Sequence, residues 1–260
     1  MNGGLLESLP LSGIFVGVSL LILASCELGY QFGKHARSNQ DQEAPSSIGA
    51  MVGGLLGMLG FVLAFTFSMA ASQFEIRKQN VLNEANAIGT AYLRADLIDK
   101  PHGTEVKRLL REYVDVRLQG VKGAGLDAAI ARSAEIHDLL WAQVSAAAAA
   151  KPTTNTSLMI QSINEVIDMH EKRLTGALRN RIPGSVWIAL AAITFLTMGT
   201  MGMLIGFSGK RRTVAVIAVS LAFAVLVTLV VDLDSPQRGL IIVGQQSMVN
   251  LQHSMGGGKM

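Results

Sequence analysis

Side chains that could catalyse a reaction or bind a metal are scattered along this chain. Its histidines are His35, His102, His137, His170 and His253. No metal-ligand spacing occurs among them, so packed or solvated histidines are expected. The sequence also has no G-x-S-x-G turn, no glycine-rich phosphate loop and no paired-carboxylate motif. We therefore expect no enzyme activity, no cofactor and no metal site.

An acidic pair follows the last hydrophobic segment, in the run from Asp232 through Asp234 to Pro236. The simplest interpretation is a water-facing helix end, followed by a turn that Ser235 and Pro236 set. Carboxylates are also ligands of Ca²⁺, so a cation site is one functional alternative. A neck-forming contact between subunits is the other.

The second hydrophobic segment is rich in glycine and phenylalanine. Gly53, Gly57 and Gly60 recur at helical spacing and form a small-residue face that would let another helix approach closely. The alternative interpretation is an apolar pore, narrowed by phenylalanine and gated by loss of its water. The candidate pore-lining residues are Gly57, Gly60, Phe61, Phe65 and Phe67.

Four segments are long and apolar enough to position these residues in a membrane. Hydrophobic residues make up 50% of the 260, and the mean hydropathy is +0.38. Crossing a hydrocarbon core of about 30 Å takes roughly 20 apolar residues, which residues 11–28, 48–71, 186–207 and 213–231 supply. Only Glu27 is charged among them, at the end of the first. The absence of charge in mid-membrane argues against a pump.

Residues 73–183 are more polar and have the size of a domain. Their apolar positions recur every three or four residues in four stretches, which predicts four amphipathic helices with short turns. The first continues the second span, until residues 100–103 interrupt it and Thr104 caps the next helix. The fourth begins at Asn155 or Thr156 and leads towards the third span, with a bend at Pro183 and Gly184.

The predicted fold is an all-α membrane protein with four transmembrane helices and an extramembrane antiparallel helical bundle inserted between helices 2 and 3. The predicted parts are residues 1–72 with transmembrane helices 1 and 2, residues 73–183 with the bundle, residues 184–235 with transmembrane helices 3 and 4, and residues 236–260 as a C-terminal tail.

Several runs together resemble the bacterial bestrophin-like membrane family. They are Glu27 to Lys34, Gly60 to Ala70, Glu84 to Ala95 and Asp232 to Gly239, of which the third is the most specific. The family-motif residues among them are Glu27, Glu84, Asn86, Gly89, Thr90, Tyr92, Arg94, Asp232, Asp234 and Pro236.

The resemblance implies a function and a membrane location. Bestrophins are pentameric anion channels whose second membrane helix lines the pore, so it implies a homo-oligomeric ion channel in the bacterial inner membrane. The chain departs from the family pattern at Gln237, and the bestrophin calcium clasp is not recognisable. The implied partners are the lipid bilayer, further copies of the chain and small inorganic ions.

Charge near the spans bears on orientation. Lys34, Arg37 and the basic run 210–212 lie on one side by parity, and the positive-inside rule assigns that side to the cytoplasm and the bundle to the periplasmic face. The basic flanks of the bundle argue for the opposite orientation. The net charge of +3 is modest and its basic residues mostly flank spans, so nucleic acid is not expected.

Besides a homo-oligomeric channel, two other functions fit the sequence. One is a membrane-anchored interaction or sensor module whose bundle binds a partner. The other is a small-solute transporter, which the absence of mid-membrane charge disfavours.

Overall fold

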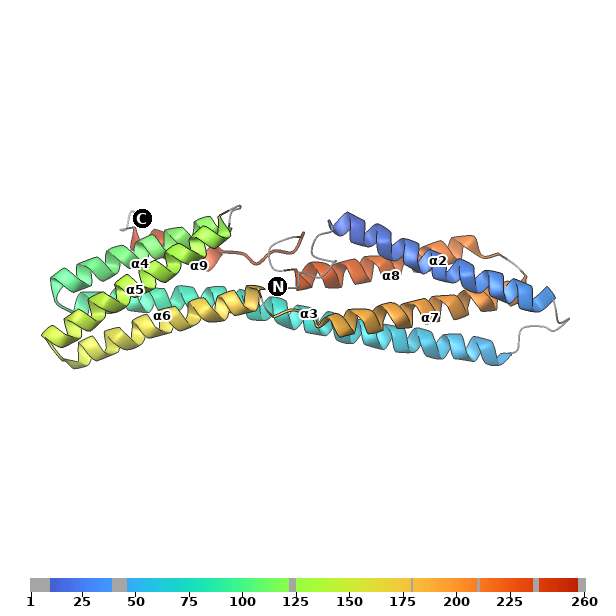
Figure 1. Cartoon of the computed structure of the whole chain (residues 1–260), viewed down its shortest axis with the longest axis horizontal. Coiled ribbons are helices and arrows are strands. Elements are labelled where there is room, and N and C mark those ends of the chain that lie inside the picture. Colours follow the sequence, from blue (N-terminus) through green and yellow to red (C-terminus); the bar gives the residue numbers. More distant parts are fainter. Residues whose placement is uncertain are drawn as a thin grey trace. The chain divides into compact units, whose positions relative to one another are not determined.

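The structure is a computed structural model that describes residues 10–38, 46–121, 125–178, 180–209, 211–235 and 239–256, and the statements below concern these residues. They are helical, with no strand among them (Figure 1). The helices are α2 (Leu11–Ser38), α3 (Ser46–Arg94), the short 3-10 helix η1 (Ala95–Leu97), α4 (Lys100–Val121), α5 (Leu126–Ala150), α6 (Thr154–Leu178), α7 (Gly184–Ser208), α8 (Thr213–Asp234) and α9 (Gln246–Met255).

The chain forms two compact units. Unit 1 comprises Met1–Phe74 and Arg181–Ile241, and unit 2 comprises Glu75–Asn180 and Ile242–Met260. Helix α3 supplies residues to both.

Unit 1 contains the helices that are long and apolar enough to cross a membrane. In the described residues there are four, α2, α3, α7 and α8, which confirms the predicted all-α fold with four membrane-crossing helices.

Helix α2 continues to Ser38, so Glu27 lies inside a helix and not at its end. The hydropathy pattern marks where a segment turns polar, whereas the backbone hydrogen bonds continue beyond that point.

Two small-residue surfaces let α2 and α7 pack at very short range. A Cβ added at Gly29 would lie 1.9 Å from the carbonyl oxygen of Gly199, and one at Gly33 would lie 2.2 Å from that of Met203. From the other side, a Cβ at Gly202 would lie 2.0 Å from the carbonyl oxygen of Cys26. Such close backbone approach is the usual role of glycine between membrane helices.

Unit 2 is built around one apolar core. The apolar residues of α4 that recur every three or four positions form a stripe that is buried throughout, namely Val106, Leu109, Leu110, Tyr113 and Val114. It packs with buried side chains from α3, α5, α6 and α9. Helix α4 contacts α5 and α9, and α5 contacts α6.

Helix α4 begins at Lys100, five residues before the start that an N-cap at Thr104 predicts. The break falls at Ile98 and Asp99, and Thr104 lies inside the helix, so its predicted role as an N-cap is wrong. Pro101 is tolerated in the first turn because its missing N–H would have no partner there. Gly103 is needed for space, since a Cβ would lie 2.2 Å from the carbonyl oxygen of Ala95.

Helix α6 begins at Thr154, just before the expected start. The N–H of Thr156 donates to Oγ1 of Thr153 at 3.2 Å, and the N–H of Thr153 donates to Oγ1 of Thr156 at 2.9 Å. This reciprocal pair satisfies N–H groups that the first turn leaves free.

Helix α9 has no counterpart in the sequence-based prediction. Met248 and Met255 are buried in the core of unit 2, and the hydroxyl of Tyr92 donates to the carbonyl oxygen of Met255 at 3.2 Å. A ten-residue helix with two core contacts shows little periodicity in sequence.

Candidate functional site: the open face of α3 and the motif residues

The part of α3 in unit 1 has one packed face and one open face. The packed face joins the unit 1 core, where Leu59, Leu63 and Ala70 meet Ile22 of α2 and Met198 of α7. These contacts determine how α3 is rotated about its axis.

The open face carries the five candidate pore-lining residues. The side chains of Phe61, Phe65 and Phe67 are 73%, 61% and 40% exposed. Apart from the adjoining residues and backbone of α3 itself, no described atom lies within 4 Å of the Cβ position of Gly57 or Gly60. No helix of the same chain therefore uses these glycines for close packing within the described residues, and pore lining stays a prediction.

The five residues span less than half of the helix circumference. At about 100° per residue, Phe61 lies about 40° from Gly57, and Gly60 lies about 60° to the other side. Phe65 and Phe67 lie about 80° to either side of Gly57 by the same geometry. If Gly57 faces an axis, the two outer phenylalanines point sideways.

The motif residue Glu84 lies at the centre of a buried charged network in unit 2. Its carboxylate is fully buried and forms ion pairs with Arg117, at 3.0 Å, and with Arg173. The hydroxyl of Tyr113 donates to Oε1 of Glu84 at 2.7 Å. The Tyr113 oxygen therefore accepts from Nδ1–H of His170, 2.9 Å away.

Two histidines in this network are held neutral. Burial lowers the pKa of His137 to about 4 and that of His170 to about 3, because desolvation penalises the charged imidazolium. The positive charge of Arg117 adds to the effect on both. The two rings meet edge to face with centroids 4.8 Å apart.

Within the motif run, Gly89 and Tyr92 lie against α9. A Cβ at Gly89 would lie 3.3 Å from Cδ1 of Leu251, so the position favours a small residue. Tyr92 donates to Met255 and accepts from Arg111 at 2.7 Å. These motif positions therefore attach the C-terminal helix.

The other residues of this run differ in their surroundings. Arg94 donates to Oγ of Ser162 at 2.7 Å and to the carbonyl oxygen of Leu158 at 3.2 Å, which ties α3 to α6. Asn86 and Thr90 are exposed.

The acidic pair of α8 is buried, so the expected water-facing helix end is wrong. Asp232 accepts the N–H groups of Leu240 and Ile241 at 3.0 and 3.2 Å, and Asp234 accepts the N–H of Ile182 at 3.1 Å. Both buried carboxylates thus have backbone N–H partners, and the N–H of Ile182 is itself buried. Gly239 has a φ of 132°, and a Cβ there would lie 1.7 Å from Oδ1 of Asp232.

Pro236 lies outside the described residues. Among the described residues, no group of three or more His, Cys, Asp or Glu side chains could hold a metal ion.

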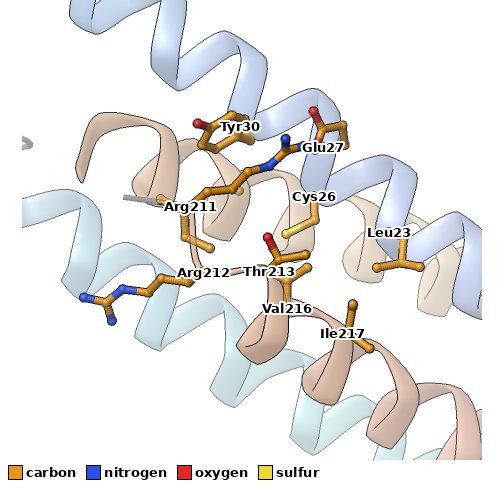
Figure 2. Close-up of a pocket in the computed structure, with 11 residues that line it drawn as sticks. Leu23, Cys26, Glu27, Tyr30, Arg211, Arg212, Thr213, Val216 and Ile217 are labelled. Carbon is orange, nitrogen blue, oxygen red and sulfur yellow. Dashed lines mark hydrogen bonds and ion pairs between the residues drawn. The ribbon is translucent and has the colours of Figure 1, made fainter. Parts of the chain in front are cut away.

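The motif residue Glu27 lines a pocket of about 200 Å³ in unit 1 (Figure 2). Its carboxylate accepts from Nη2 of Arg211 at 2.7 Å. The guanidinium of Arg211 lies over the ring of Tyr30, 5.3 Å from the centroid. The pairing of Glu27 with Arg211 was not predicted, because nothing in the sequence spacing shows that α2 and the start of α8 are neighbours.

Comparison with known proteins gives one family match and several structural matches. The model of the bestrophin-like domain matches residues 17–248. The sequence matches no curated protein.

The structural matches share the fold at low sequence identity. A variant of a bacterial bestrophin homologue from Klebsiella pneumoniae aligns with a TM-score of 0.68 and 13% identity, covering 95% of this chain and 99% of the other. A crystallised membrane protein variant aligns with a TM-score of 0.68 and 12% identity over the same shares.

The family match covers most of the chain, including the motif runs around Glu27, Glu84 and Asp232. The helices of this chain include four that can cross a membrane in its described residues. The structure of the bacterial bestrophin homologue has the same fold. The chain is a multi-pass membrane protein that belongs to the bestrophin-like family.

Proposed function

We propose that this protein forms a homo-oligomeric ring that conducts small inorganic ions, with α3 lining the axis. The observation that carries the proposal is the open face of α3. Gly57 and Gly60 have no described neighbour within 4 Å of a Cβ position, although α2 and α7 use their glycines for close contact. A ring of copies would place this face around a common axis.

The resemblance to bestrophins favours anions as the permeant ions. From Ile48 to Phe74 the chain has neither acidic nor basic residues, so this face lacks the rings of Asp or Glu that are typical of cation-selective pores. The exposed ring of Phe61, about 40° from Gly57, makes an apolar constriction that can close by dewetting, and Phe65 and Phe67 flank it.

The remaining parts of the proposal concern location and domain organisation. The bundle of residues 73–183 lies outside the inner membrane, on the periplasmic face that the short basic loops favour. Residues 1–72 and 184–235 provide the transmembrane helices, and 236–260 follow as the C-terminal segment. No step of this function requires an enzyme activity.

Ion flux from liposomes tests the proposal. Purified protein in chloride-loaded liposomes should release chloride faster than empty liposomes, and its mass in detergent should be a multiple of the 27.6 kDa chain. Gly57→Leu should remove most of the flux, because the added side chain projects from the open face, while the oligomer stays intact. A monomeric mass together with no flux above empty liposomes would contradict the proposal.

A membrane-anchored interaction module is the second candidate. Leu93 and Leu97, one helical turn apart in unit 2, are 71% and 56% exposed. The interaction module would be favoured if the protein formed an intact ring without conductance and if Leu93→Ser weakened the capture of a protein partner.

A further inference from the structure

The fold places the pocket beside Glu27 at the boundary of the membrane. Arg211 and Arg212 lie in the turn between α7 and α8, which are both membrane-crossing helices. A turn that joins two spans emerges at the headgroup layer, so the pocket begins there and extends along α8 into the apolar layer.

The walls of the pocket are apolar and its mouth is polar. Leu23 of α2, Ile205 of α7 and Val216 and Ile217 of α8 form the walls. Figure 2 shows Arg211 reaching across to Glu27, and the side chain of Arg212 directed outward, away from that pair. Pockets that enclose a whole small molecule hold roughly 300–1,000 Å³, so this volume of about 200 Å³ takes part of a ligand.

The charges at the mouth select an anion. Glu27 neutralises one guanidinium, since it pairs with Arg211. Arg212 is exposed, and no acidic side chain lies within ion-pair distance of it among the described residues, so one positive charge remains in excess. Tyr30 adds an aromatic ring with a polar tip, which suits the boundary between headgroups and acyl chains.

We propose that this pocket binds an anionic phospholipid. Arg212 and Arg211 contact the headgroup phosphate, and a length of one acyl chain lies along Leu23 and Ile217. A free anion would use the arginines but gain nothing from the apolar walls. This binding requires only that unit 1 lie in a membrane, so it can hold even if the protein conducts no ions.

Lipid binding by the intact protein tests the proposal. Purified protein in detergent is titrated with phosphatidylglycerol, with phosphatidylcholine of the same acyl chains, and with inorganic phosphate, and binding is followed by native mass spectrometry. We expect tighter binding of phosphatidylglycerol than of phosphatidylcholine, and no competition by millimolar phosphate.

Two variants separate the headgroup from the acyl chain. Arg212→Gln should weaken phosphatidylglycerol binding about fivefold, the effect of one basic residue near an anionic headgroup, and leave phosphatidylcholine binding unchanged. Ile217→Trp, which fills the pocket, should weaken both. Lys172→Gln, an exposed position in unit 2, is the matched control and should change neither.

Three results would overturn the proposal. They are equal binding of the two lipids to the unaltered protein, displacement of phosphatidylglycerol by phosphate, and an Arg212→Gln variant that binds like Lys172→Gln. If Ile217→Trp lowers the melting temperature, the proposal is judged by Arg212→Gln alone. Arg212 is exposed and Arg212→Gln removes no described ion pair, so this variant should keep the fold.

Discussion

At the scale of single residues, Glu84 is the most consequential side chain of unit 2. One carboxylate faces two buried guanidinium groups, those of Arg117 and Arg173, and a tyrosine hydroxyl. Replacing a buried ion pair by apolar groups can be neutral, but removing one partner leaves uncompensated charge. The network is therefore sensitive to the loss of Glu84 above all.

Glu84→Gln should destabilise the protein by about 3–5 kcal/mol, because both arginines lose their buried counter-charge. Thermal unfolding followed by circular dichroism in detergent measures the change. Glu112→Gln is the control, since Glu112 pairs with the partly exposed Arg108 and Arg132 and should cost about 1 kcal/mol or less. Similar melting temperatures for the two variants would show that the network does not stabilise the fold.

The neutral histidines predict a loss of stability in mild acid. The pKa of His137 is about 4 in the folded protein and about 6.5 when unfolded, so between these values the unfolded chain binds more protons. Stability is then complete above about pH 6.5 and decreases as pH falls towards 4, by on the order of 3 kcal/mol for this group. The groups that face it are Glu84, Tyr113, Arg117, Asp138 and His170.

Melting temperatures between pH 7 and pH 4.5 test this prediction. The unaltered protein should lose stability over this range, and His137→Leu should lose less. His253→Leu, at an exposed position of α9, should behave like the unaltered protein. If the melting temperature of His137→Leu falls with pH as steeply as that of the unaltered protein, His137 is not the cause of the loss of stability.

Sequence alone located Glu84 in a motif run but not its network. Its partners Arg117 and Arg173 lie 33 and 89 residues away on other helices, and periodicity does not show which polar positions of different helices meet. The same limit hid the pairing of Glu27 with Arg211. The buried role of Asp232 was missed because carboxylates at a helix end are usually exposed.

At the scale of elements, the glycines of unit 1 divide into two kinds. Gly29 and Gly33 of α2 and Gly202 and Gly206 of α7 lie against the backbone of the partner helix, whereas Gly57 and Gly60 of α3 face away from the other described helices. Only the first kind is required for the fold of a single chain.

Gly202→Leu should therefore destabilise the fold, and Gly57→Leu should not. Gly202→Leu forces α2 and α7 apart, because its Cβ alone would lie 2.0 Å from the carbonyl oxygen of Cys26, and should cost roughly 1–3 kcal/mol or more. Gly57→Leu should leave the melting temperature nearly unchanged. A greater loss of stability from Gly57→Leu would mean that the open face is needed for folding.

The helices themselves were largely predictable, since long apolar segments and stripes of threes and fours determine them. The stripe of α4 from Val106 to Val114 is buried throughout. The glycine contact between α2 and α7 was not predicted, although Gly29 and Gly33 have the spacing of such contacts. Composition drew attention to the second span instead, where glycines are more numerous.

At the scale of the whole molecule, membership of the bestrophin-like family and the open face of α3 support an assembly of several copies. The four-span fold could be predicted because the cost of exposing such apolar segments to water leaves few alternatives. The path of the ions could not be predicted from the sequence, because a phenylalanine that faces lipid and one that faces a pore look alike there.

Accessibility of Gly57 to a charged thiol reagent tests the central claim most directly. Cys26 is the single cysteine, so Gly57→Cys in a Cys26→Ala background places one thiol on the open face. In planar bilayers the reagent should block the current of the Gly57→Cys variant. The current of Ile188→Cys, at an exposed position of α7 in the same background, should be unchanged by the reagent. A Gly57→Cys current that the reagent leaves unchanged would contradict a pore lined by α3.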